Sequence, residues 1–157
     1  MRRAAVLVTA VLTLSAGAST VDAHSLHAAQ SVESSINSMR AQHGCGPLRF
    51  HLGLSLSAGK QARLLLADGE LNHDAGSPMP ERLHRAAPSA SLLGEDLAWG
   101  TGSAALPDSI VRSWMNSASH RRIMLDCRFS QLGVGIAAGQ FGDNTERTTV
   151  YAADFAA

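Results

Sequence analysis

An acidic pair stands inside an otherwise apolar run at residues 93–100, which read LGEDLAWG. If this run is extended, Glu95 shares one face with Leu93, Leu97 and Trp99, because side chains alternate along a strand. If it is helical, Glu95 still neighbours apolar residues. A buried carboxylate without a partner is costly in either case. The run therefore predicts that other polar side chains of the chain meet Glu95.

Two of the seven histidines are the first candidates for that partnership. His73 and His120 each lie in a loop-like stretch beside apolar or helical segments, whereas the other histidines occupy terminal or uninformative positions. Histidine changes its charge near neutral pH and also serves as an acid, a base or a metal ligand. Only the fold can bring these two residues to Glu95, and their spacing alone does not establish that it does.

The common catalytic signatures are missing from the sequence. It contains no H-E-x-x-H, no G-x-S-x-G and no G-x-x-x-x-G-K motif. Ser57 and Lys60, in SAGK, match the S-x-x-K of penicillin-recognising enzymes, but those enzymes also need K-T-G and Lys60 is the only lysine. We therefore interpret this match as chance.

The N-terminus has the layout of a secretory signal peptide over residues 1–23. Two arginines precede an apolar run from Ala4 to about Ala18, and small residues precede a cleavage site after Ala23. A cut after Ala18 is the rival. The run is short for a membrane span, so we expect a secreted protein with no transmembrane anchor after signal removal. With 13 basic and 13 acidic residues and no basic patch, a nucleic-acid partner is not expected.

The two cysteines, Cys45 and Cys127, are far apart and form no C-x-x-C motif. In an exported protein such a pair predicts one disulfide bond, and two free buried thiols are the alternative.

Hydrophobic periodicity predicts helices in the first part of the chain and strands at its end. This order indicates an α+β domain, without repeats or linkers, whose helices pack on an antiparallel sheet. The expected helices are 30–43, 54–68, a short one after Pro80, and 107–117, and the expected strands are 131–139 and 148–155.

Several segments in the same order resemble the bacterial CAP superfamily, which comprises cysteine-rich secretory proteins, antigen 5 and pathogenesis-related 1 proteins. LNHD is similar to the family's FSH segment, GEDLAWG to GENLAWG, and SWMNSASHRRIML to WMNSPGHRANIL. LGVGIA and VYAADFA resemble the closing hairpin, and INSMRAQHGCGPLRF the first helix and its turn. The resemblance covers residues 31–156 and implies a three-layer α-β-α sandwich with a small antiparallel sheet.

The resemblance also implies a cleft in which two histidines and two acids meet. His73, Glu95 and His120 match three of them, and Ser117 stands where the second acid would be. Two imidazoles and a carboxylate suit a divalent metal such as zinc. Asp154 matches a family acid and is expected to accept hydrogen bonds near the sheet edge, while Trp99 and Trp114 are expected in the core.

The function that the resemblance implies is an extracellular binding module without enzymatic activity. Its ligand would be a lipid, a peptide or a cell-wall glycan. The alternative is a zinc-dependent hydrolase in which His73, Glu95 and His120 hold the metal and a bound water attacks the substrate. The missing fourth acid and the lack of an evident general base favour the binding module.

Overall fold

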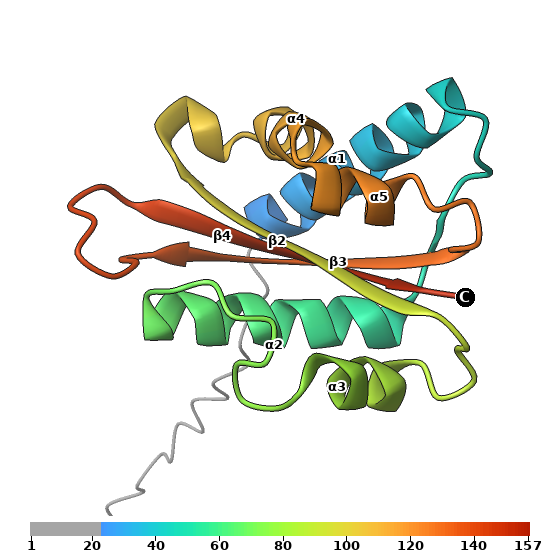
Figure 1. Ribbon diagram of the computed structural model, residues 1–157. Helices are drawn as coiled ribbons and strands as arrows, with labels where there is room; N and C mark the ends of the chain where they lie inside the picture. The colour runs from blue at the N-terminus through green and yellow to red at the C-terminus, as the bar shows by residue number, and fades with distance from the viewer. Residues whose placement is uncertain (1–22) are drawn as a thin grey trace, which may run out of the picture.

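The computed structural model describes residues 23–157 and contains one four-stranded sheet with helices on both faces (Figure 1). The predicted signal peptide, apart from Ala23, lies outside the described residues and stays a prediction. No helix within residues 23–157 has the length and apolar character needed to cross a membrane. The elements are α1 (Ala23–Gln42), β1 (Arg49–Phe50), α2 (Leu52–Asp68), α3 (Met79–Ala86), β2 (Leu93–Thr101), a 3-10 turn η1 (Gly102–Ala105), α4 (Pro107–Asn116), α5 (Ala118–Met124), β3 (Gln131–Gly139) and β4 (Thr148–Ala156).

The sheet has the strand order β1-β3-β4-β2. β4 lies in the interior and pairs antiparallel with both β3 and β2, so the predicted hairpin is present. β2, which contains the acidic pair, forms one edge. The two-residue β1 pairs in parallel with β3, so one short parallel pair is added to the predicted antiparallel sheet and the whole sheet is mixed.

Helices cover the two faces unequally. Figure 1 shows α2 and α3 on one face and α1, α4 and α5 on the other, which confirms the α+β fold with three layers. The larger part of the core lies under α1 and α4, where Ile36, Trp114 and Phe155 are buried. The smaller part lies under α2 and includes Leu65 and Val150.

Two glycines of β3 allow α2 to lie directly against the sheet. A Cβ atom on Gly133 would approach the backbone nitrogen of Ser55 to 2.1 Å, and one on Gly135 would approach the carbonyl carbon of Ala58 equally closely. Backbone atoms cannot move aside as flexible side chains can, so only glycine fits. The GVG segment therefore fixes the distance between α2 and the strands that hold the site.

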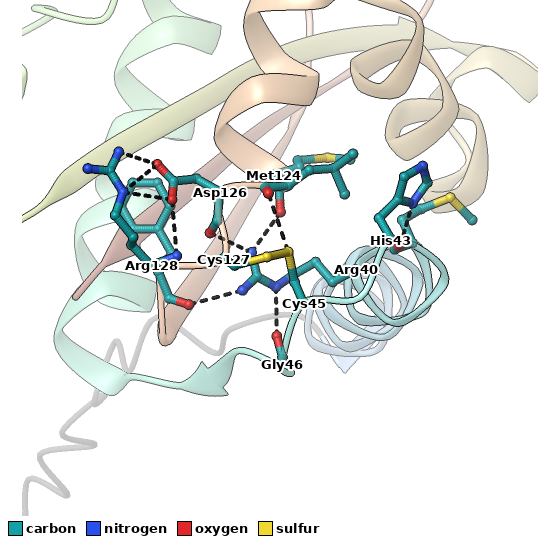
Figure 2. The surroundings of a disulfide bond; sticks show 11 residues. Arg40, His43, Cys45, Gly46, Met124, Asp126, Cys127 and Arg128 are labelled. Carbon is teal, nitrogen blue, oxygen red and sulfur yellow. Dashed lines mark hydrogen bonds and ion pairs between the residues drawn. A yellow bond between two sulfur atoms is a disulfide. The ribbon is translucent and has the colours of Figure 1, made fainter.

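A disulfide bond joins Cys45, just after α1, to Cys127, just before β3, which confirms the predicted pairing. Figure 2 shows the side chain of Arg40 beside this bond. Arg40 is fully buried, and its guanidinium donates hydrogen bonds to backbone carbonyl oxygens on both sides of the bond. The acceptors are Gly46, Met124, Asp126 and Phe129, at 2.8–3.0 Å. Arg40 thus ties α1 to the segment that enters β3.

Two helices differ from the prediction. α1 begins at Ala23 rather than near residue 30, in a stretch without a clear apolar repeat. Residues 118–124 form α5, although the sequence predicted a loop there. His120 therefore lies on a short helix, packed beside α4.

Candidate functional site

Two carboxylates face each other across neighbouring strands under α2 and α3. Glu95 on β2 is directly opposite Asp154 on β4, and their side chains are fully buried. Like charges in directly opposed positions repel, and burial strengthens the penalty. A cation is therefore needed between them.

Arg82 of α3 supplies that cation. One terminal nitrogen, Nη2, contacts Oε2 of Glu95, and the other, Nη1, lies 3.0 Å from Oδ2 of Asp154. Nη1 also donates to the hydroxyl of Ser57 on α2, at 2.9 Å. Burial raises the pKa of Asp154, and the nearby Arg82 opposes that rise. The planar guanidinium suits this arrangement because it can bind several oxygen atoms at fixed angles.

His73 links the buried acid to solvent. Its Nδ1 lies 2.8 Å from Oε1 of Glu95, and its side chain is 52% exposed. It comes from the loop between α2 and α3, which Gln61 secures by donating a hydrogen bond to the carbonyl oxygen of Asn72. The hydrogen bond to Glu95 raises the pKa of His73, although partial burial acts against the rise. We name His73, Arg82, Glu95, Asp154 and Ser57 the Glu95 cluster.

His120 comes close to this cluster but does not join its hydrogen bonds. Its Nδ1 is buried and has no hydrogen-bond partner. Burial lowers the pKa of His120, and the positive charge of nearby His73 lowers it further. The two histidines therefore have pKa values shifted in opposite directions, so that His73 carries more of the positive charge near neutral pH.

The remaining predicted side chains lie elsewhere. Ser117 stands between α4 and α5, and its hydroxyl is 3.1 Å from that of Ser119. Asp154 accepts hydrogen bonds as predicted, but from an interior strand and not near the sheet edge. Trp114 belongs to the core and donates to the carbonyl oxygen of Leu97. The core prediction for Trp99 is wrong, because its side chain is 43% exposed and packs on Phe141.

The second acid of the pair, Asp96, points to the opposite face of the sheet. Its neighbour in β4 is Ala153, which belongs to the core under α1 and α4. Both carboxyl oxygens are buried without a hydrogen-bond partner, and burial together with the charge of Glu95 raises the pKa of Asp96 to about 8. Asp96 is therefore largely protonated at neutral pH and takes no part in the Glu95 cluster.

The side chains do not form the three-ligand metal site that the resemblance implied. Both oxygens of Glu95 already accept a hydrogen bond, one from His73 and one from Arg82, so a metal ion would have to share the carboxylate with these two donors. Within residues 23–157 no three His, Cys, Asp or Glu side chains are grouped so that they could hold a metal ion. Without Glu95, His73 and His120 would supply only two of the three protein ligands that such a metal site needs.

Arg82 is the central residue that sequence reasoning missed. It lies in PERLHRA, a segment that also contains the basic residues His84 and Arg85, and nothing in that pattern separates it from the exposed Arg85. The one available signal was the need of Glu95 for a partner.

Comparisons with known proteins define the family to which this fold belongs. A sequence model of the cysteine-rich secretory protein family (CAP) matches residues 34–155. The uncharacterized protein YkwD of Bacillus subtilis is 30% identical over 102 residues, which are 63% of this chain and 38% of that protein. The chain belongs to the cysteine-rich secretory protein family, as the sequence motifs predicted.

Solved structures show the same fold at low sequence identity. An extracellular SCP-domain protein from Bacillus anthracis aligns with a TM-score of 0.69 and 22% identity, covering 84% of this chain and 41% of that one. An outer surface protein of Borrelia burgdorferi aligns with a TM-score of 0.66 and 22% identity, covering 81% and 90%. The chain thus spans about two fifths of the length of YkwD and of the Bacillus anthracis protein.

Proposed function

We propose that the protein is a secreted binding module without enzymatic activity, which binds its ligand at the surface around His73. The ligand is a lipid, a peptide or a cell-wall glycan. The predicted signal peptide supports secretion, as does the description of the Bacillus anthracis and Borrelia burgdorferi structures as extracellular and outer surface proteins.

The observation that carries the proposal is the burial and pairing of Glu95. Its two oxygens accept bonds from His73 and Arg82, and its side chain is fully buried, so solvent water does not reach it directly. A general base must reach the proton that it removes. Of the bonded pair His73 and Glu95, His73 is the exposed member and the one that a ligand can contact. The cluster is suited to hold an imidazole at the surface in a fixed orientation, and the hydrogen bond to Glu95 raises the pKa of this imidazole.

Binding is tested by co-sedimentation of the mature protein with anionic phospholipid vesicles and with purified cell-wall sacculi, and by capture on a peptide array. We expect saturable binding to one of the three and about tenfold weaker binding for His73→Ala, because a charge-assisted hydrogen bond to a ligand contributes about 1.5–3 kcal/mol. His84→Ala, on the exposed face of α3, is the matched control and should bind as the wild type does.

The zinc-hydrolase alternative has a separate readout. Metal analysis of the purified protein that found one zinc ion per chain, lost in His73→Ala, together with cleavage of any of these materials, would replace the binding proposal. Equal binding by the wild type and His73→Ala would contradict the proposal that the ligand binds around His73.

A further inference from the structure

A second site lies on the other side of Arg82, between α2 and α3. A pocket of about 300 Å³ opens there, and residues of the loop before α3 complete its wall. Its polar lining consists of three cations and two hydroxyls, namely Lys60, Arg82, Arg85, Ser57 and Ser77.

The pocket has more positive than negative charge. No carboxylate lines it, and Glu81 reaches only Arg85, at 3.8 Å, with both side chains more than 60% exposed. Such an exposed pair is weak. Lys60, the only lysine of the chain, is also exposed. Arg85 also donates a hydrogen bond to the hydroxyl of Ser77, at 3.0 Å, which holds its guanidinium at the mouth of the pocket. An anion that binds there would meet Lys60 and the remaining donors of Arg85.

Arg82 forms the buried inner part of the pocket lining. The residue is 7% exposed, and both of its terminal nitrogens are engaged by Glu95, Asp154 and Ser57. Its Nε is buried and has no hydrogen-bond partner, and the same holds for Oδ1 of Asp154. Arg82 therefore lines the pocket with its positive charge anchored to the sheet, and the accessible cations of the pocket are Lys60 and Arg85.

The rest of the pocket is apolar. Leu56, Leu64, Ala75 and Ala86 form this part of the wall. The loop is held against α2 at Gly76, whose φ of +74° favours glycine and where a Cβ atom would lie 2.9 Å from the Leu64 side chain. An apolar wall beside a cationic rim fits an anionic group carried on a small apolar body.

We propose that the pocket between α2 and α3 binds a small organic oxyanion, with Lys60 and Arg85 holding the charged group and the leucines contacting the apolar part. Ser57 and Lys60, the S-x-x-K match of the sequence, line this pocket as binding groups and not as a catalytic pair. The hydroxyl of Ser57 accepts a hydrogen bond from Arg82 rather than from Lys60. The pocket shares Arg82 and Ser57 with the Glu95 cluster, but Lys60 and Arg85 lie outside that cluster, so the proposal stands whether or not the proposed function holds.

The test is an NMR titration of backbone amides with benzoate, phenyl phosphate and the neutral benzamide. We expect saturable shifts for residues 56–64 and 75–86 with at least one of the two anions and none with benzamide. The anion that binds with the lower Kd shows whether the pocket prefers a carboxylate or a phosphate group. In the double variant Lys60→Gln/Arg85→Gln the affinity should fall about tenfold or more, because two charge-assisted contacts are lost.

The matched control is Arg63→Gln/Arg122→Gln, which removes the same charge from exposed residues outside the pocket. It should bind the anion as the wild type does. The proposal is overturned if both double variants weaken binding equally, if benzamide binds as well as benzoate, or if neither anion produces saturable shifts up to about 10 mM.

Discussion

Arg82→Met is expected to lower the free energy of unfolding by about 3–5 kcal/mol at neutral pH, because the substitution leaves the buried carboxylate of Glu95 without its cation. Glu95 and Asp154 lie directly opposite each other on β2 and β4, and Arg82 is the cation that bonds to both. Methionine keeps most of the volume of the side chain, so the loss is electrostatic rather than a cavity effect. Urea unfolding at several pH values measures it.

The loss of stability in Arg82→Met, relative to the wild type, should become smaller as the pH falls. Burial already raises the pKa of Asp154, and removal of Arg82 takes away the charge that opposes this rise. The folded variant then binds more protons than the unfolded chain, so its stability decreases as the pH increases through this range. Arg85→Met, on the same helix but 63% exposed, should change stability by less than about 1 kcal/mol. A similar small effect from Arg82→Met would contradict the bridging role.

Removal of the disulfide bond should have an effect of similar size. The double variant Cys45→Ser/Cys127→Ser opens a loop with a sequence separation of 82. The loop-entropy model gives roughly 4–5 kcal/mol of lost stability for a loop of this length. We expect the variant to fold, because Arg40 still bonds four carbonyl groups that surround the former bond (Figure 2).

Urea unfolding of wild type and double variant gives the measurement, with the same protein before and after reduction as a second comparison. The m-value, which is the slope of the free energy of unfolding against urea concentration, should also increase. The reason is that a chain without the cross-link exposes more surface when it unfolds. An unchanged unfolding midpoint, or alkylation of both cysteines in native unreduced protein, would contradict the structural role of the bond.

The sequence predicted the parts of the fold that follow strong local patterns. α2 and α4 carry clear apolar stripes, and β3 and β4 are rich in β-branched and small residues, so their positions were found within a few residues. α5 was missed because it has seven residues and buries only Met124. A helix this short is not stable by itself and forms through its packing in the fold. β1, with two residues, likewise exists through its pairing with β3.

For the site, the sequence predicted which residue needed partners but not which residues supply them. Glu95 was identified by the apolar run around it, and His73 by its match to the family motif. The role of Arg82 depends on the register that sets Glu95 opposite Asp154 and on the packing of α3 beside β2. Both are long-range properties that no local pattern records.

The central claim, that Glu95 holds His73 at the surface, is tested most directly by NMR titration of the imidazoles in wild type, Glu95→Gln and Asp96→Asn. In the wild type the pKa of His73 should lie above 6.5 and that of His120 below it. Glu95→Gln should lower the pKa of His73, because the amide carries no negative charge. Asp96→Asn should leave the pKa of His73 unchanged, because Asp96 faces the opposite side of the sheet and is largely protonated at neutral pH. Equal shifts of the His73 pKa in the two variants, or no shift in either, would contradict the account.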